Sequence, residues 1–244
     1  AFSTYSRIPM PQVEWSDENR KYSMCFFPLI GAVIGLILWG WLYLCNALKV
    51  GILLKGAVGA IIPLLVTGGI HMDGFMDTSD AMASWQPKER RLEILKDSHT
   101  GAFAVIGCCA YLMIAAGMFS EMTMDQALPL ALCFVASRAA SAMTSVSMKP
   151  AKAEGMLLSF TKTAQSRAVI LTSGVDALLC LCVWLFSGWV MACICAAALL
   201  GCVVFYKRMA YAQFGGVTGD LAGWLLQVTE LALIAVIVMG GKIV

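Results

Sequence analysis

Residues 53–80 read LLKGAVGAIIPLLVTGGIHMDGFMDTSD, an apolar stretch that runs without a spacer into a row of carboxylates. The apolar part, Leu53–Ile70, carries only one charged residue, Lys55. It is long enough to cross roughly 30 Å of hydrocarbon as a helix. Asp73, Asp77 and Asp80 follow within ten residues. This arrangement predicts a membrane protein with a polar site at the end of a membrane crossing.

Similar apolar stretches recur along nearly the whole chain. Hydrophobic residues make up 60% of the 244 positions and charged residues 13%, which excludes an ordinary soluble composition. We therefore predict an all-α bundle of about seven transmembrane helices in a lipid bilayer, forming one domain over residues 1–244. The predicted spans are Phe27–Leu48, Leu53–Ile70, Ala102–Ser120, Ala127–Met148, Ala168–Ser187, Trp189–Phe205 and Leu221–Gly240.

The basic residues favour one orientation of this bundle. With residue 1 inside, most of the 17 Lys and Arg residues fall in cytoplasmic segments, whereas only Lys49, Lys55 and Lys242 lie outside. Because loops rich in Lys and Arg stay in the cytoplasm, we expect the segment from His71 to Gly101 to face inward. The net charge is only +2, and the dispersed cations argue against nucleic-acid binding. The inner group is Arg7, Arg20, Lys21, Lys88, Arg90, Arg91, Lys96, Lys149, Lys152, Lys162, Arg167, Lys207 and Arg208.

The spacing of Asp73, Asp77 and Asp80 places their carboxylates on one face of a helix. Such groups repel one another unless a cation lies among them. Oxygen ligands suit Mg²⁺, which takes one or two carboxylates and fills its other positions with water and substrate phosphate oxygens. The row therefore indicates either a magnesium and diphosphate site or a solvated acidic helix end.

A second acidic cluster favours the magnesium interpretation. Pro87 is suited to start a short helix, on which Glu89, Glu93 and Asp97 would share one face. Cations and small polar residues suited to phosphate lie around these acids. They are Arg90, Arg91, Lys96 and Ser98. The two arginines either bind phosphate or anchor the chain at the membrane surface.

Two further polar features flank the apolar spans. His71 either hydrogen-bonds a substrate phosphate or a ligand carboxylate, or lines the helix end. The turn from Phe214 to Asp220 reads FGGVTGD, which suits a phosphate cradle, and Asp220 is also placed to act only as a helix N-cap.

Three ionisable residues fall inside predicted spans: Arg138, Asp176 and Glu230. A charge in hydrocarbon requires a partner or a polar cavity. Arg138 therefore either contacts substrate beneath the cytoplasmic mouth or forms an internal ion pair with one of the two acids.

Three ordered stretches are specific enough to suggest a family. TGGIHMDGFMDTSDA (67–81), RLEILKDSHTG (91–101) and GGVTGD (215–220) resemble the cobalamin 5′-phosphate synthases, also called adenosylcobinamide-GDP ribazoletransferases. The resemblance covers nearly the whole chain and departs from the family pattern at His99, where Arg is usual. It includes Arg7 with Pro9, FPLIG (27–31), Ser137 with Arg138, Glu154 with Gly155, and Glu230.

The resemblance implies a reaction and a set of residues. In that reaction the ribose 3′-hydroxyl of α-ribazole, or of its 5′-phosphate, attacks the cobinamide-linked phosphorus of adenosylcobinamide-GDP, and GMP leaves. We expect Asp73, Asp77 and Asp80 to bind Mg²⁺, and these three with Asp97 to be catalytic. Substrate contacts are expected from His71, Arg91, Glu93, Lys96, Ser98, Arg138, Thr218 and Asp220. The expected location is a bacterial or archaeal cytoplasmic membrane, and a homo-oligomer is compatible with it.

Two other functions compete with this one. Membrane prenyltransferases and CDP-alcohol phosphotransferases also use carboxylate-bound Mg²⁺ and diphosphate, but their N-D-x-x-D and D-G-x-x-A-R strings do not occur here. A small transporter would account for the ionisable residues within spans. Transporter sites usually lie near the bilayer midplane, often between inverted repeats, whereas these acids concentrate at one surface and no repeat is found.

Overall fold

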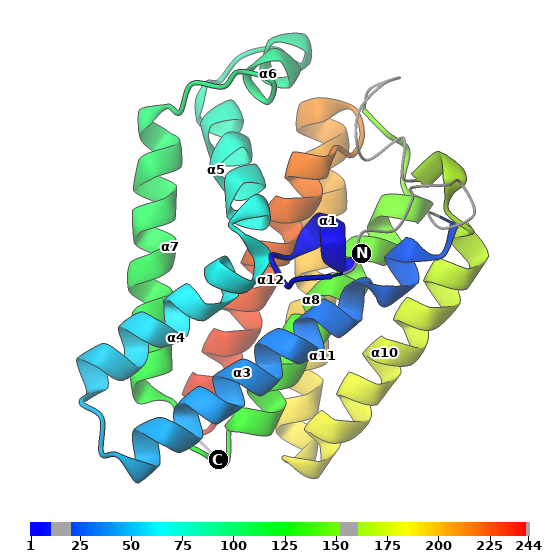
Figure 1. Ribbon diagram of the computed structural model, residues 1–244. Helices are drawn as coiled ribbons and strands as arrows, with labels where there is room; N and C mark the ends of the chain where they lie inside the picture. Colours follow the sequence, from blue (N-terminus) through cyan, green and yellow to red (C-terminus); the bar gives the residue numbers. More distant parts are fainter. Residues whose placement is uncertain (11–20, 152–160, 243–244) are drawn as a thin grey trace.

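The computed structural model describes residues 1–10, 21–151 and 161–242, and it consists of helices joined by short turns (Figure 1). No β-strand occurs in these ranges, where Pro150 and Val217 form a single parallel bridge. The all-α prediction is confirmed. The long helices are α3 (Phe27–Ala47), α4 (Ile52–Thr67), α5 (Ile70–Ala83), α7 (Ala102–Glu121), α8 (Ala127–Ser147), α10 (Ser166–Phe186), α11 (Trp189–Met209) and α12 (Gly219–Gly240). The short segments are α1 (Phe2–Tyr5), η1 (Ser23–Phe26), α6 (Lys88–Ile94) and the π-helix η2 (Ala210–Phe214).

Six of these helices are long and apolar enough to cross a membrane, and the bent pair α4–α5 brings the number to seven. The predicted spans correspond to α3, α7, α8, α10, α11 and α12 with small differences at their ends. The largest difference is in α11, which continues to Met209 instead of ending at Phe205. The prediction of about seven transmembrane helices is confirmed by length and composition.

The second predicted span, Leu53–Ile70, is wrong as a single straight helix. α4 ends at Thr67, and α5 leaves it at an angle of 99°. α4 starts beside the end of α3, and α5 ends beside α6 at the opposite end of the molecule (Figure 1). By length and composition the two helices together form one broken span, and the predicted acidic helix is its second half.

Gly68 and Gly69 produce this break. Their φ angles are 66° and 80°, in the left-handed region that side chains with a Cβ rarely adopt. Gly68 ends α4 as a left-handed cap, and Gly69 is the residue before the first turn of α5. The Arg7 side chain lies over Gly68, and the Arg7 N–H donates to the carbonyl oxygen of Val66 (2.8 Å). The amino-terminal segment thus covers the bend.

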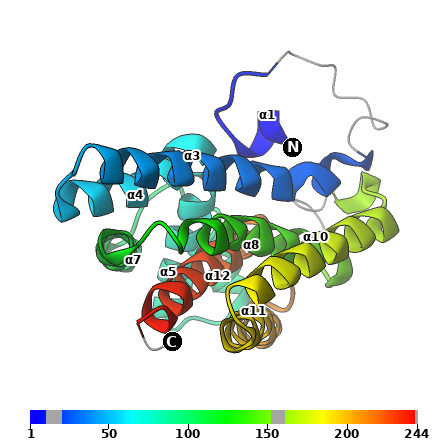
Figure 2. The ribbon, with the colours of Figure 1, turned by 90° about the horizontal axis from the view of Figure 1, so that it is seen from below.

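Helices α8 and α12 form the centre of the bundle. In their most apolar stretches 67% and 72% of the residues are buried, compared with 22% in α7, α10 and α11. Viewed along the bundle, α12 lies among α5, α8 and α11, with α10 and α7 toward the outside (Figure 2). Apolar side chains that face outward on the peripheral helices are expected where lipid is the solvent.

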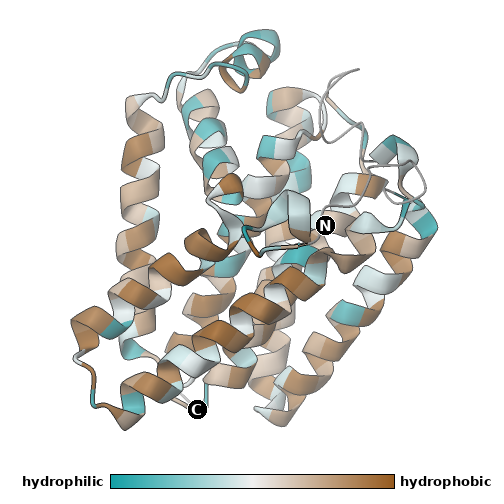
Figure 3. Ribbon diagram, viewed as in Figure 1, coloured by the Kyte–Doolittle hydropathy of each residue, from teal (hydrophilic) through white to brown (hydrophobic). Residues whose placement is uncertain are grey.

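The two ends of the bundle differ in polarity. Hydrophilic residues gather on α6 and on the neighbouring ends of α5 and α11, whereas the middle parts of α3, α4 and α7 are mostly hydrophobic (Figure 3). The opposite end is closed by short contacts. Lys55 Nζ donates to the Met122 carbonyl oxygen (3.0 Å), and Lys242 pairs with Glu121 (2.8 Å). The end that carries α6 is therefore the one whose polar residues could form a binding site.

Candidate active site

α5 is held against α12 by two glycines. A Cβ at Gly74 would lie 2.8 Å from the carbonyl oxygen of Asp220, and a Cβ at Gly223 would lie 3.1 Å from that of His71. Small residues allow two helix backbones to approach this closely within a membrane. The contact brings the acidic face of α5 next to the amino-terminal turn of α12.

This contact assembles a cluster of four carboxylates, which we call the acid cluster: Asp73, Asp77, Asp80 and Asp220. Asp73 is exposed, and the other three are partly buried. Asp77 interacts electrostatically with each of the other three. All four carry like charge, so a bound cation would relieve their repulsion. The helical spacing predicted for the first three is confirmed, since all lie on α5.

The acid cluster has the donor chemistry of a magnesium site. Its side chains offer only carboxylate oxygens, which a small hard cation prefers. As they are placed, no group of three or more His, Cys, Asp or Glu side chains in the described ranges could hold a metal ion by itself. Mg²⁺ commonly takes one or two carboxylates and leaves its other positions to water and substrate phosphate. Asp73 and Asp77, one helical turn apart, fit this mode.

Asp80 has a structural partner as well. Its carboxylate oxygens accept hydrogen bonds from the backbone N–H groups of Gly101 (2.6 Å) and Ala104 (2.9 Å) at the start of α7. A carboxylate at this position satisfies unpaired N–H groups and complements the helix dipole. Asp80 therefore joins the end of α5 to the start of α7, and it fixes the end of the loop that follows α6.

The short helix predicted to start at Pro87 is present as α6 and carries Glu89 and Glu93 one turn apart, but the prediction that Asp97 continues their row is wrong. α6 ends at Ile94, so Asp97 lies beyond the helix and cannot continue its face. Asp97 instead accepts hydrogen bonds from the His99 backbone N–H (3.0 Å) and contacts the His99 ring (2.6 Å). These bonds hold the pKa of Asp97 below its usual range. Glu93 is exposed and pairs with Arg90 on the same helix.

The cations predicted around this row lie in different surroundings. Arg90 is exposed, whereas Arg91 is buried on the face of α6 that packs toward α5 and η2. Lys96 and Ser98 are exposed in the loop between α6 and α7, near Asp97. These two residues are therefore accessible to a ligand, as Asp73 is on α5.

The glycine-rich turn, residues 214–220, is hydrogen-bonded to the segment that follows α8. The Val217 N–H donates to the Lys149 carbonyl oxygen, and the Ala151 N–H donates to that of Val217, each at 2.9 Å. The hydroxyl of Thr218 caps α12 by accepting from the Leu221 N–H (3.2 Å). The prediction that Asp220 acts as the N-cap is wrong, because Asp220 lies in the first turn of the helix.

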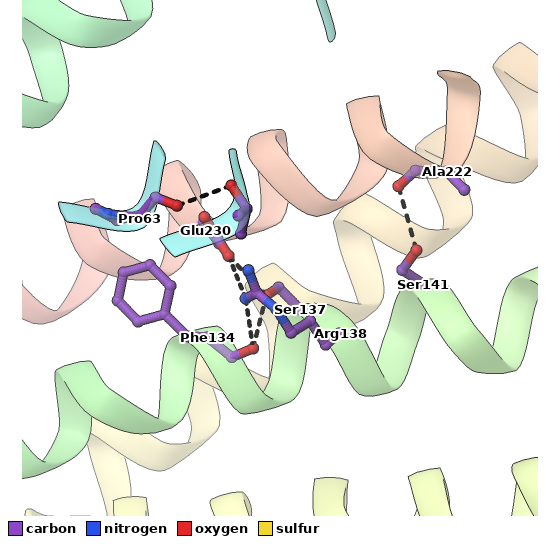
Figure 4. A network of polar contacts seen from close by, with 8 residues as sticks. Pro63, Phe134, Ser137, Arg138, Ser141, Ala222 and Glu230 are labelled. Atoms are coloured by element: carbon purple, nitrogen blue, oxygen red, sulfur yellow. Dashed lines mark hydrogen bonds and ion pairs between the residues drawn. The ribbon is translucent and has the colours of Figure 1, made fainter. Parts of the chain in front are cut away.

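His71 and Arg138 lie inside the protein. His71 is 6% exposed and packs between the rings of Tyr5 and Phe27. His71 therefore lines the amino-terminal end of α5, which was one of the three interpretations of this residue. Arg138 forms an ion pair with Glu230 (2.6 Å), and both side chains are 1% exposed (Figure 4). The ion-pair alternative holds, with Glu230 and not Asp176 as the partner.

Sequence reasoning did not place in the site the residues that join its parts, although it singled out Glu230 as a charge within a span. Gly74, Gly223 and Glu230 were absent from the predicted site, although a glycine between two metal-binding candidates is a signal of close helix contact. Four residues of the predicted inner loops and family motifs lie outside the described ranges: Arg20, Lys152, Glu154 and Gly155.

Comparison with known proteins assigns a family to this arrangement. The family model described as cobalamin-5-phosphate synthase matches residues 1–238. The chain belongs to this family. An adenosylcobinamide-GDP ribazoletransferase of Lachnoclostridium phytofermentans is 42% identical over 245 aligned positions, which cover 100% of this chain and 94% of the relative.

More distant relatives carry the same name. A Clostridium botulinum protein is 34% identical, with 95% of this chain and 92% of the relative covered. A Brevibacillus brevis protein is 29% identical, with 98% and 96% covered. Both are named adenosylcobinamide-GDP ribazoletransferase. No solved structure matches the chain.

Proposed function

We propose that this chain is an adenosylcobinamide-GDP ribazoletransferase, which joins adenosylcobinamide phosphate to the ribose 3′-hydroxyl of α-ribazole or of its 5′-phosphate and releases GMP. The observation that carries the proposal is full-length membership of the family together with the acid cluster. A diphosphate substrate is commonly bound through a divalent cation, and the carboxylates of α5 and α12 are the groups that would hold it.

Asp73 and Asp77 are the proposed magnesium ligands. Asp73 is the most exposed of the cluster, and Asp77 lies one turn further along the same face. Bound Mg²⁺ would neutralise the diphosphate and make GMP a better leaving group. Asp80 contributes its charge to the cluster while its oxygens cap α7. Asp220 brings a fourth carboxylate from α12.

The reaction needs no covalent intermediate. The 3′-hydroxyl oxygen forms a new bond to the cobinamide-linked phosphorus, and the bond from that phosphorus to the bridging oxygen breaks. The bridging oxygen leaves with GMP. A carboxylate of the acid cluster accepts the proton of the hydroxyl group. Lys96 and Ser98, exposed in the loop after α6, would contact the phosphates or the nucleotide.

The proposed location is the cytoplasmic membrane, with the polar end that carries α6 facing the cytoplasm. This orientation is supported by the basic residues of the inner loops. It gives soluble substrates access to the end of the bundle on which hydrophilic residues gather. A homo-oligomer remains compatible with these features.

Product analysis with purified protein tests the proposed function. The full-length chain in lipid nanodiscs is given adenosylcobinamide-GDP and α-ribazole, with Mg²⁺ or with EDTA, and both products are separated chromatographically. We expect GMP and the cobalamin product in equal amounts, and only with Mg²⁺. Release of GMP without a joined product would indicate hydrolysis and contradict the proposed function. Product formation in EDTA would contradict the proposed magnesium site.

A further inference from the structure

The buried ion pair ties the two central helices together. Arg138 lies on α8 and Glu230 on α12, with Arg138 Nη1 and Glu230 Oε1 2.6 Å apart. Ser137 donates to the same carboxylate oxygen (3.3 Å), and Arg138 also donates to the Phe134 carbonyl oxygen (2.9 Å) (Figure 4). A buried pair of this kind contributes little to stability but is costly to break, because removing one partner leaves an unpaired charge.

The same interface reaches the part of α12 that carries α5. One turn further along α8, the Ser141 hydroxyl donates to the carbonyl oxygen of Ala222 (3.2 Å; Figure 4). Ala222 precedes Gly223, whose backbone packs against that of His71. Contacts between α8 and α12 therefore fix the segment of α12 on which the first turn of α5 rests.

A second connection runs from the ion pair to α5 through one aromatic ring. The Arg138 guanidinium carbon lies 5.8 Å from the centre of the Phe27 ring, and the His71 ring lies 5.5 Å from it. His71 is also close enough to Arg138 for the two to interact electrostatically. The Phe27 ring thus lies between the side chains of Arg138 and His71 and contacts both. His71 is in turn two residues from Asp73.

We propose that Arg138 and Glu230 are positioning residues that hold the first turn of α5, through Phe27 and the Ala222–Gly223 segment, so that Asp73 and Asp77 face Asp220. This proposal rests on the function proposed above, because the positioned groups are its acid cluster. Neither residue contacts substrate, since both side chains are enclosed by α8, α12 and α3. Their effect on the reaction is exerted through the position of α5.

Two variants test this role, with a matched control. Glu230→Gln removes the buried charge, and Phe27→Leu leaves the ion pair but removes the ring between Arg138 and His71. Glu121→Gln is the control, because it breaks an ion pair of similar length (2.8 Å) that is exposed at the other end of the bundle. Each full-length protein is studied in nanodiscs by hydrogen exchange over residues 70–83 and by steady-state turnover.

Both test variants are expected to exchange the amides of α5 roughly tenfold faster than the wild type, because α5 opens more readily once its support is removed. Turnover, kcat, should fall by a similar factor, whereas KM for α-ribazole should change little, since the substrate contacts remain. The Glu121→Gln variant should match the wild type in exchange and in turnover. If Glu230→Gln does not fold, Glu230→Asp, which keeps the charge but shortens the side chain, tests the ion pair, and Phe27→Leu tests its connection to α5.

Wild-type exchange over residues 70–83 in the folded variants would overturn the proposal, even if their melting temperatures fall. A lower melting temperature alone describes a residue that only stabilises the fold. Absence of turnover in the wild type would contradict the proposed function instead. The exchange measurement would then still decide whether the ion pair positions α5.

Discussion

The backbone of Gly74 lies against the backbone of Asp220: a Cβ added at Gly74 would lie 2.8 Å from the Asp220 carbonyl oxygen and 2.9 Å from its Cα. One residue without a side chain therefore sets the distance between the acids of α5 and the first turn of α12. Any larger residue must move one helix away from the other.

Gly74→Ala is expected to reduce turnover by roughly tenfold or more and to lower stability by about 1–3 kcal/mol, as overpacking of a close contact does. Thermal unfolding and the product assay measure the two effects. Gly117→Ala is the control, because a Cβ at that position meets no atom within 4 Å. Equal activity of Gly74→Ala and the wild type would show that close contact between α5 and α12 is not required.

Asp77→Asn is expected to lower kcat by about 10²–10³-fold through loss of charge stabilisation at the reacting phosphates. The same change removes one of four mutually repelling charges. In EDTA the variant should therefore melt at a temperature at or above that of the wild type, and Mg²⁺ should no longer raise it. Glu89→Gln, an exposed substitution on α6, should leave both measurements unchanged.

Asp80→Ala is expected to destabilise the protein by about 1–2 kcal/mol, because the N–H groups of Gly101 and Ala104 lose their acceptor. In this variant, hydrogen exchange of the backbone amides should speed up more in the first turn of α7 than in α8. Asp80→Asn keeps one acceptor oxygen and should give an intermediate value. Unchanged exchange in the alanine variant would rule out the capping role.

Asp97 is expected to titrate below an ordinary aspartate, because the backbone N–H and ring of His99 bind its carboxylate. A group with a depressed pKa in the folded state stabilises the protein above its unfolded pKa, and this contribution is lost as the pH falls through the folded value. Carbonyl ¹³C NMR of the labelled protein measures the pKa. His99→Ala should raise it toward the usual value, and no change would contradict the contact.

Local patterns were sufficient to predict most of the helices. The ends of α3, α7, α8 and α12 follow from apolar length and turn residues, and the common face of Asp73, Asp77 and Asp80 follows from helical spacing. The break at Gly68 was not predicted, because the apolar stretch runs across it to Ile70; the pair Gly68 and Gly69, whose φ angles are positive, was the turn signal that could have indicated it. Continuous hydropathy therefore does not distinguish a straight span from a bent one.

Contacts between residues far apart in the chain could not be predicted from the sequence. The approach of Asp220 to Asp77 joins residues far apart in the chain, and the choice of Glu230 over Asp176 as the partner of Arg138 depends on how α10 and α12 pack around α8. The end of α6 before Asp97 was also missed. There the turn formed by Asp97 and His99 competes with helix continuation.

The break between α4 and α5 also has a consequence for biosynthesis. α5 carries three aspartates into the bundle and rests mainly on α12, which is synthesised well after it. Before α12 enters the bilayer, α5 can already contact α7, whose first N–H groups bind Asp80, but the close backbone contact between Gly74 and Asp220 is absent. Because Asp220 lies on α12, the acid cluster is complete only after translation has passed residue 220, so a chain truncated before α12 would keep most of its crossings but would have no assembled site.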